Sequence, residues 1–303
     1  MDKESHYLAA FANDGSIVGV LPLVRLKSLL FGDFLISVPF FNYGGSISNG
    51  PEVRKELFKE AAELGAAIGV DHIESRELSP FPEWPGRTDK VAMILELPDS
   101  EDELSKSLGS KRRSQIRRPL REDPRTRKGG SELIGEFYAV FSRNMRDLGT
   151  PVYSKKMFRD LVDRFSENCE IIVIDIGGVP AAAAFLIHAN NMTEIPWAST
   201  VRKFNPVSIN MLLYWEALRS AIAAGSKRFD FGRSTVDTGT YRFKKQWGAK
   251  PTQFHWHYWL GSSDELPGLN PHSGKYDIAI KVWRHLPLSI TRVIGPSIVK
   301  HLP

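Results

Sequence analysis

The chain has 303 residues, of which 42% are hydrophobic and 25% are charged, a balance typical of globular rather than disordered proteins. No apolar run is long enough to predict a membrane-spanning helix, and the polar start Met1–His6 does not have the composition of a signal peptide. Cys169 is the single cysteine, which excludes an internal disulfide and a thiolate metal cage. We therefore expect a cytoplasmic protein.

The net charge of +5 is concentrated in one segment of the chain. Lys111 to Lys128 contain nine Lys or Arg and two acidic residues, a local charge of +7, so the remainder carries −2. This density predicts a local anionic partner, such as a nucleotide-sugar diphosphate, a lipid diphosphate or tRNA, rather than a general coating of DNA. A solvated surface helix would explain the same charges.

The first part of the chain predicts a hairpin, a third strand, a long helix and a fourth strand. We expect strands at 6–11, 17–24 and 34–38, a helix at 52–68 and a strand at 71–75. The next segment, 78–86, contains three prolines, which block both strand ladders and helix turns. It predicts a boundary between two units.

The second part begins with an expected strand at Val91–Leu97, followed by the basic segment. Its later elements repeat the order of the first part. They are helices at 131–148 and 154–166, strands at 171–176, 179–188 and 193–199, a helix at 207–224, a strand at 228–231, a helix at 239–247 and a strand at 253–260. We therefore divide the chain into a unit at 1–86, a unit at 87–262 with a basic insert at 110–128, and a tail at 263–303.

This order resembles that of the GNAT acetyltransferase fold. The likeness implies an α+β protein of two GNAT-like units in tandem, the first lacking its leading strand and helices. In that fold two strands splay apart, and the donor's pyrophosphate binds amides at the start of the helix between them. Free amides and the helix dipole make such a position an anion site in general.

In the second unit the corresponding helix start is Asn205–Asn210. Asn205 suits the cap and Pro206 the first helical position, so Asn205, Ser208 and Asn210 are the predicted donor-binding residues. A capped helix without a ligand explains the same residues. The glycine-rich loop of coenzyme A users is absent.

Three stretches resemble the FemAB family, whose best-known members move an amino acid from aminoacyl-tRNA to an amine of a cell-wall precursor. The nearest likeness is to FemAB-related proteins of exosortase (PEP-CTERM) and exopolysaccharide gene clusters. The stretches are 38–45, 110–118 and 229–234 with 239–248. The likeness implies transfer of an acyl or aminoacyl group, from acyl-CoA or aminoacyl-tRNA, to an amine of a sugar or peptidoglycan-type acceptor, with no permanently bound cofactor.

Acyl transfer to an amine needs a positioned donor, a proton acceptor and groups that stabilise the oxyanion. Asp230 is the predicted proton acceptor and Tyr241 the second catalytic candidate, although Tyr241 also suits core packing. Arg233 and Ser234 follow at the strand end, where Arg233 could grip a phosphate or carboxylate. An Asp230–Arg233 pair that braces a turn is the alternative.

The other candidates for binding the acceptor or its phosphate groups are Lys244, Arg113, Arg117, Tyr43 and Gly44. Arg113 and Arg117 share a helical stripe that Pro119 should kink or end. Tyr43 and Gly44 lie where the first unit would hold its own phosphate loop, or they make an ordinary turn. A non-catalytic binding or scaffold protein with a degenerate donor site is the alternative function.

Two further features carry weaker signals. His255 and His257 share one face of a strand but lack a third ligand, so no metal site is predicted. The tail from Lys275 to His301 mixes apolar and cationic residues, and Pro287 and Pro296 should break it. It either packs on the protein or lies on the anionic inner face of the cytoplasmic membrane.

Overall fold

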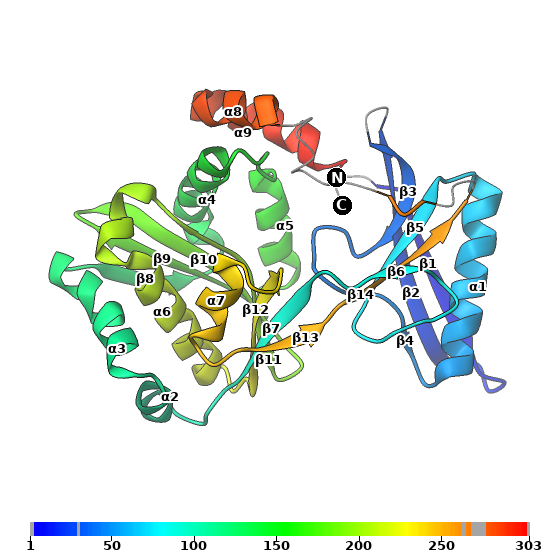
Figure 1. Ribbon diagram of the computed structural model, residues 1–303, viewed down its shortest axis with the longest axis horizontal. Coiled ribbons are helices and arrows are strands. Elements are labelled where there is room, and N and C mark those ends of the chain that lie inside the picture. Colours follow the sequence, from blue (N-terminus) through cyan, green and yellow to red (C-terminus); the bar gives the residue numbers. More distant parts are fainter. Residues whose placement is uncertain (1–2, 29–30, 262–264, 268–276, 302–303) are drawn as a thin grey trace.

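The computed structural model describes residues 3–28, 31–261, 265–267 and 277–301. Two seven-stranded sheets lie side by side, and each is covered by helices (Figure 1). The predicted α+β class with two related units is confirmed.

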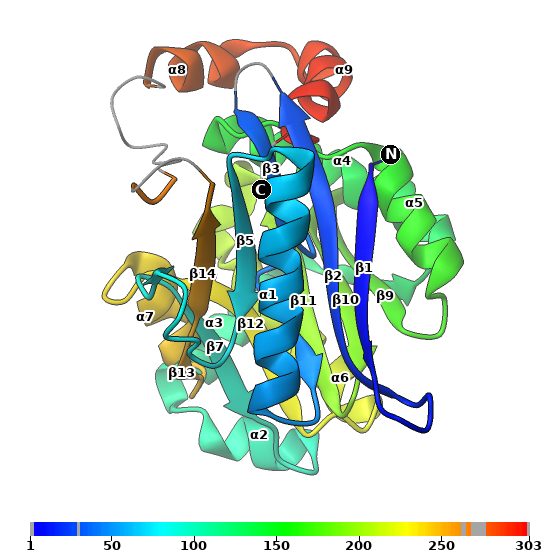
Figure 2. The same cartoon turned by 90° about the vertical axis from the view of Figure 1, so that its right-hand side faces the viewer.

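The first unit has the predicted hairpin, third strand, helix and fourth strand. Helix α1 starts with Pro51 and ends at Gly69, whose φ of 69° provides the left-handed cap. It covers the outer face of the first sheet (Figure 2), and its buried Leu57, Phe58 and Ala61 form the core with sheet residues. The elements are β1 (Ser5–Phe11), β2 (Ile17–Ser28), β3 (Gly32–Ser37), β4 (Ile47–Ser48), α1 (Pro51–Ile68) and β5 (His72–Glu77).

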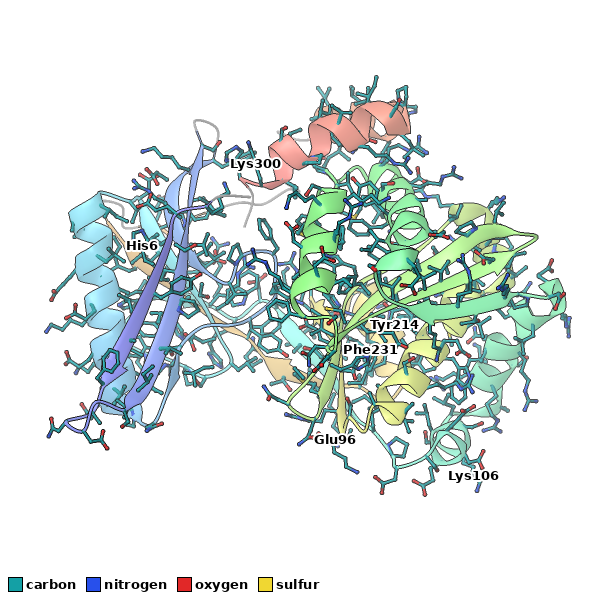
Figure 3. All side chains as sticks on the ribbon, turned by 180° about the vertical axis from the view of Figure 1, so that it is seen from behind. His6, Glu96, Lys106, Tyr214, Phe231 and Lys300 are labelled. Atoms are coloured by element: carbon teal, nitrogen blue, oxygen red, sulfur yellow. The ribbon has the colours of Figure 1, made fainter. Side chains whose placement is uncertain are left out.

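The second unit surrounds its sheet with helices on both faces. Helices α4 and α5 cover one face with a phenylalanine-rich core, and α6 and α7 cover the other, where Tyr214 stacks on Phe231 (Figure 3). Its elements are α2 (Glu101–Ser107), α3 (Ser110–Arg117), the 3₁₀ turn η1 (Arg118–Glu122), β8 (Arg125–Gly129), the 3₁₀ turn η2 (Ser131–Leu133), α4 (Ile134–Leu148), α5 (Lys155–Arg164), β9 (Cys169–Ile176), β10 (Val179–Ala189), β11 (Met192–Thr200), the 3₁₀ turn η3 (Arg202–Val207), α6 (Ile209–Ala223), β12 (Arg228–Ser234) and α7 (Gly239–Lys245).

The leading strand of the second unit is not the predicted one. The strand expected at the start, β7 (Val91–Glu96), lies inside the sheet between β12 and β13, antiparallel to both. The edge strand before the long helices is β8, which the sequence assigned to the basic insert. Charged residues suit an exposed edge, and Arg127 of β8 is held by an ion pair with Asp175 of β9 (3.0 Å).

The last predicted strand divides between the two sheets. Residues Lys250–Gln253 (β13) pair with β7 in the second sheet, whereas His255–Leu260 (β14) pair with β5 and the short β6 (Gly86–Arg87) in the first. Phe254, buried at the crossing, separates them. The expectation that 253–260 completes the second unit is therefore wrong, and the first sheet is completed by a strand from the far end of the chain.

Two helices, α8 (Asp277–His285) and α9 (Leu288–Val299), pack on α4 at one end of the molecule (Figures 1 and 2). Pro287 separates them as predicted, but Pro296 lies within α9 and does not break it. The predicted boundary at 262–263 and the tail start at Lys275 lie outside the described residues. Within the described ranges no helix is long and apolar enough to cross a bilayer.

The strand exchange predicts that the first unit cannot fold alone. A fragment of residues 1–88 lacks β14, so β5 loses its antiparallel partner and buried side chains are exposed. We expect no cooperative urea transition by circular dichroism. Residues 89–253 keep every strand of the second sheet and serve as the control, which should unfold cooperatively. Cooperative unfolding of the 1–88 fragment would contradict the exchange.

Candidate active site

Strands β11 and β12 diverge, as predicted for the donor-binding gap. They are nine and seven residues long but pair at only three positions, of which Glu194–Asp230 is the last. A bulge at Phe231 and Gly232, with a φ of 75° at Gly232, shifts the register of β12 against β7 just beyond this pair. The two strands thus form a gap that opens from Glu194 and Asp230 toward their carboxyl ends.

The start of α6 lies at the wide end of this gap, because η3 leads directly to it from the end of β11. Ser208 (φ 63°) is the N-cap, and no side chain binds the first amides of α6. The Met211 amide donates to the Ser208 carbonyl (2.9 Å), and the amides of Ile209 and Asn210, together with the helix dipole, are available to an anion. Asn205 and Pro206 lie in η3, so their predicted roles as cap and first helical residue are wrong.

The displaced Asn205 has a different partner. Its Oδ1 accepts a hydrogen bond from Thr200 Oγ1 (3.2 Å), which fastens the turn to the end of β11. Ser208 and Asn210 remain at the helix start, where the sequence placed them.

Asp230 is completely buried, at 0% exposure. Its Oδ2 accepts a hydrogen bond from Tyr43 Oη (2.9 Å) and its Oδ1 one from the Gly232 amide (2.7 Å). Burial raises the pKa of Asp230, and these hydrogen bonds oppose that shift. Asp230 therefore braces the first unit's loop against β12. Neither interpretation from the sequence describes this position. As a proton acceptor Asp230 would need access to the gap, but it faces no solvent, and as a turn brace it would pair with Arg233, which it does not.

The first unit repeats this brace. Strands β3 and β5 also pair at three positions and end with Ile36–Glu74. Glu74 is buried, and Tyr258 Oη donates a hydrogen bond to its Oε2 (3.0 Å). A buried acid held by a tyrosine at the narrow end of both gaps indicates a structural role for each acid.

Glu194, which the sequence analysis did not select, has the properties of a proton acceptor. Burial first, and then the charge of Asp230, raise the pKa of Glu194 to about 8, whereas a hydrogen bond from Asn42 lowers it. Its Oε1 is buried without a hydrogen-bond partner among the described residues. A carboxyl with a pKa near neutrality at such a position is suited to proton transfer. The available signal was that Glu194 is the single charged residue of β11.

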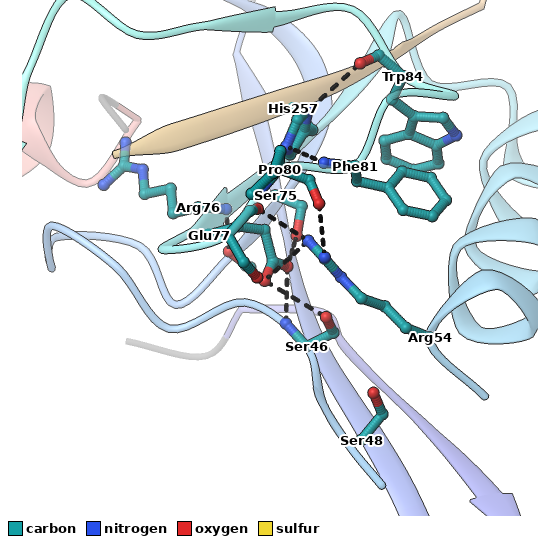
Figure 4. Close-up of polar contacts among 12 residues, drawn as sticks. Ser46, Ser48, Arg54, Ser75, Arg76, Glu77, Pro80, Phe81, Trp84 and His257 are labelled. Carbon is teal, nitrogen blue, oxygen red and sulfur yellow. Dashed lines mark hydrogen bonds and ion pairs between the residues drawn. The ribbon is translucent and has the colours of Figure 1, made fainter. Parts of the chain in front are cut away.

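Corresponding positions in the two gaps differ in one decisive respect. β12 pairs with β7 and β5 pairs with β14, so positions can be matched by their partners on these two strands. With the bulge of β12 taken into account, Ser234 corresponds to Glu77 and Arg233 to Arg76. In the first unit Glu77 fills the gap mouth, where Ser46 and Arg54 point toward it (Figure 4). In the second unit Ser234 is too short to do so, and its buried Oγ has no partner in the part of the chain that is described.

The hydrogen bonds of Glu77 show how firmly the first gap is closed. Its carboxylate accepts from the Ser46 amide (2.8 Å) and from Ser75 Oγ (2.7 Å), and it forms an ion pair with Arg54 (3.5 Å). A Cβ added at Gly45 would lie only 2.0 Å from Glu77 Oε1, so the loop packs directly on the carboxylate. The protein's own anion therefore occupies the mouth of the first gap.

His257 belongs to the same support. Its Nε2 accepts from the Phe81 amide (2.9 Å) and its Nδ1 donates to the Trp84 carbonyl (3.2 Å), which requires a neutral ring (Figure 4). Burial lowers the pKa of His257, in agreement. His255 stacks on it with ring centroids 6.2 Å apart. The described residues contain no group of three or more metal-ligating side chains.

Arg233 and Arg76 lie over the ring of Trp256 between the two units, 5.8 and 4.5 Å from its centroid. Arg76 is buried and paired with Glu74 (2.7 Å). Arg233 is exposed and forms no ion pair with a described residue, although the surrounding protein and then Arg76 lower the pKa of Arg233. It is thus a free cation between the units, as an anion-binding role requires.

Lys244, predicted to bind the acceptor or its phosphate, and Tyr241, predicted as a catalytic candidate, do not face the gap. The Lys244 ammonium is buried and donates to the carbonyls of Gly232 (3.0 Å) and Arg233 (2.7 Å), so it stabilises the β12 bulge. Burial lowers the pKa of Lys244 to about 8. Tyr241 is buried in the core under α6 and α7. The alternative of core packing for Tyr241 agrees with this position.

Tyr43 and Gly44 do not form a phosphate loop. Tyr43 is committed to Asp230, and the Gly44 amide donates to the Arg76 carbonyl (3.1 Å). Gly44 has a φ of 147°, and a Cβ there would lie 2.7 Å from Val38 Cγ2. Close packing within the first unit, rather than a ligand, explains this glycine.

The basic segment divides into structural and free cations. Pro119 follows the end of α3, as predicted. Arg113 donates to the carbonyls of Ser105 and Leu108 and joins α2 to α3, so its predicted phosphate role is not supported. Arg117 is exposed. It belongs to a basic surface of exposed cations without ion pairs to described residues, namely Lys111, Arg117, Arg118, Arg121 and Arg125.

Comparisons with known proteins agree with this architecture. Residues 110–245 match the family model described as an acetyltransferase (GNAT) domain, and no curated protein matches the chain. The fold is similar to that of FemX (14% identity, TM-score 0.60, covering 84% of this chain and 88% of that one). It is also similar to L-PGS from Bacillus licheniformis (13%, 0.61, 97% and 90%) and to a tandem GNAT protein from the clavulanic acid biosynthesis pathway (10%, 0.55, 87% and 85%).

The chain is therefore a tandem GNAT-fold protein. Among the described residues the first element of the first unit is the hairpin strand β1, whereas β8, α4 and α5 precede the hairpin of the second unit. The predicted fold class is confirmed, and the resemblance to FemAB proteins is supported at the level of the fold.

Removing the carboxylate that closes the first gap should destabilise the protein. Glu77→Ala leaves Arg54 and the Ser46 amide without their acceptor, and we expect a loss of about 3 kcal/mol in the free energy of unfolding by urea titration. Glu83→Ala, on an exposed neighbour, is the control and should change it by less than about 0.5 kcal/mol. Equal effects would show that Glu77 is not a support.

The raised pKa of Glu194 predicts a pH-dependent stability. Between its ordinary value of 4.5 and about 8 the folded state binds more protons than the unfolded state, so the free energy of unfolding falls as pH rises. Glu194→Gln removes this loss. We expect the variant to be more stable than wild type at pH 8.5 but not at pH 4, by thermal unfolding. Glu96→Gln on β7 is the control, and an E194Q difference that does not vary with pH would refute the assignment.

Proposed function

We propose that the protein is an acyltransferase whose activated donor binds in the β11–β12 gap of the second unit. One observation carries the proposal. Glu194 Oε1, at the narrow end of the gap, and Ser234 Oγ, farther along β12, are buried and lack partners among the described residues, and the helix start at the wide end has no side-chain cap. Buried polar groups of native proteins are normally satisfied, so this arrangement suits a polar ligand.

The residues present can perform the proton transfer of the reaction. The acceptor amine attacks the donor's carbonyl carbon, a carbon–nitrogen bond forms, and Glu194 takes the proton that the nitrogen loses. The carbon–sulfur or carbon–oxygen bond to the leaving group then breaks, and Glu194 returns the proton to that group. Beyond Glu194 the two strands diverge, so the β11 amides that face β12 no longer pair with that strand. These amides are suited to stabilise an oxyanion.

Two donor classes fit this gap, and both carry phosphate. The GNAT domain match favours acyl-CoA, whose pyrophosphate suits the amides of Ile209 and Asn210. The fold similarity to FemX, to L-PGS and to a putative lysylphosphatidylglycerol synthetase from Agrobacterium fabrum favours an aminoacyl group. The basic surface on α3 and η1 suits the phosphates of a tRNA. The shared chemistry is an acyl ester or thioester on a polyanionic carrier.

For the acceptor, Arg233 between the units is the expected ligand of an anionic group, such as the phosphate of a nucleotide- or lipid-linked saccharide. The sequence resemblance to FemAB-related proteins extends this to an amine of a sugar or peptidoglycan-type acceptor in cell-surface polysaccharide assembly. A scaffold role would require the second gap to be closed as the first one is by Glu77, and Ser234 leaves it without that carboxylate.

The proposal is tested by donor binding and single-turnover transfer with wild type, Glu194→Gln and Arg233→Ala. A thermal-shift panel of acetyl-CoA, longer acyl-CoA and aminoacyl-tRNA should identify one class that stabilises wild type and E194Q alike. E194Q should lose about 10²-fold or more in the transfer rate, because general base catalysis contributes about that much.

R233A should keep donor binding and transfer to a neutral model amine, while its KM for a phosphate-bearing amine rises. If no donor class stabilises the wild type, the transferase proposal is wrong. If E194Q transfers at the wild-type rate, Glu194 is not the proton acceptor. An unchanged KM in R233A removes Arg233 from the acceptor site.

A further inference from the structure

Helices α8 and α9 bury one face against the protein and leave a second apolar face uncovered. Trp283 of α8 and Thr291, Gly295 and Val299 of α9 are buried, and Gly295 packs on Val152. The opposite faces carry exposed aliphatic side chains at helical spacings of three and four residues. These side chains are Ile278 (76% exposed) and Val282 (56%) of α8, and Ile290 (43%), Val293 (74%) and Ile294 (39%) of α9. We call these five residues the aliphatic face.

The charges around the aliphatic face have one sign. Between 277 and 301 there are four Lys or Arg residues, and Asp277 is the single acidic residue. Lys281 and Arg284 of α8 are exposed, with Lys281 in the same helical sector as Ile278 and Val282. Two arginines are tied to the protein, since Arg284 donates to the Leu148 carbonyl (3.2 Å) and Arg292 to Ser142 Oγ (2.9 Å). The face is thus apolar with a cationic margin.

The position of the helices makes this face accessible to a flat partner. Both helices lie on α4 at one end of the molecule (Figures 1 and 2), and α9 ends beside the first unit, where Lys300 lies (Figure 3). The pKa of Lys3, in the first unit, is lowered by burial and, to a smaller extent, by the positive charge of Lys300. Two adjacent amphipathic helices with aliphatic outward faces and cationic margins match the pattern of helices that lie in a membrane interface.

We propose that the aliphatic face docks the protein on an anionic phospholipid bilayer, with α8 and α9 lying in the plane of the interface. The aliphatic side chains enter the headgroup–acyl boundary, and Lys281 contacts lipid phosphates. The inference depends on the surface of these helices and not on the acyl-transfer proposal. In this proposal both alternatives expected from the sequence apply: one face of the helices packs on the protein, and the other contacts the membrane.

The test is flotation of the full chain with phosphatidylcholine vesicles, with and without phosphatidylglycerol. Wild type should float with the anionic vesicles and much less with the neutral ones, and salt should weaken binding. Val293→Asp should reduce partitioning by about tenfold or more, since one valine no longer leaves water and a like charge faces the lipid. Lys281→Gln should weaken binding to anionic vesicles alone.

The matched control is Ile17→Asp, at an aliphatic residue of similar exposure (61%) on β2 of the first unit. It should float like wild type, and both aspartate variants should keep the wild-type melting temperature because their sites are exposed. Absence of wild-type flotation, or equal flotation of V293D, overturns the proposal. Concentration-dependent self-association that V293D abolishes, without vesicle binding, overturns it in favour of a second copy on this face.

Discussion

The junction of the two units depends on the hydrogen bond between Tyr43 of the first unit and the buried carboxylate of Asp230 in the second. A carboxyl group at 0% exposure must be compensated, and Tyr43 and the Gly232 amide together occupy both of its oxygens. The bond fixes the loop of the first unit against the last paired position of β11 and β12. The same contact therefore sets where the units meet and where the gap begins.

The two units share a plan but not a function at the gap. Each has parallel strands that part after three pairs, with a buried acid and a tyrosine at the last pair. They differ at the mouth, where Glu77 satisfies the polar groups of the first gap and Ser234 leaves the second with an unpartnered hydroxyl. In the proposed function, the Glu77 carboxylate thus distinguishes a unit that serves as a platform from one that accepts an anion.

Much of the fold followed from local patterns, because hydrophobic periodicity, glycine stops and proline breaks act within a few residues. The divergence of β11 and β12 was also expected from the element order. The pairing of β7 with β12 and of β14 with β5 was not, since strand pairing across more than 130 residues leaves no local trace. Charged β8 was missed because its solvent-exposed edge has no hydrophobic signal.

The site was harder to predict than the fold, and the reason is burial. Asp230, Lys244 and Arg113 have the chemistry of ligands, but each is consumed by a backbone or side-chain partner that the sequence does not reveal. Arg233 differs from them only in lacking such a partner. Glu194 shows the converse, because its raised pKa comes from enclosure and from Asp230 on the neighbouring strand.

The pairing of Glu194 with Asp230 has a consequence for the order of events in the proposed reaction. An anionic donor near the gap adds negative charge and favours the protonated form of Glu194, in which it cannot act as a base. An acceptor amine arrives at neutral pH as an ammonium ion, and its positive charge favours the ionised carboxylate. The ammonium loses its first proton to solvent before attack, and Glu194 takes the second as the new bond forms. Glu194 therefore becomes a base when the acceptor is in place. With donor alone it stays largely protonated, which gives the carboxyl little capacity to activate water against the donor.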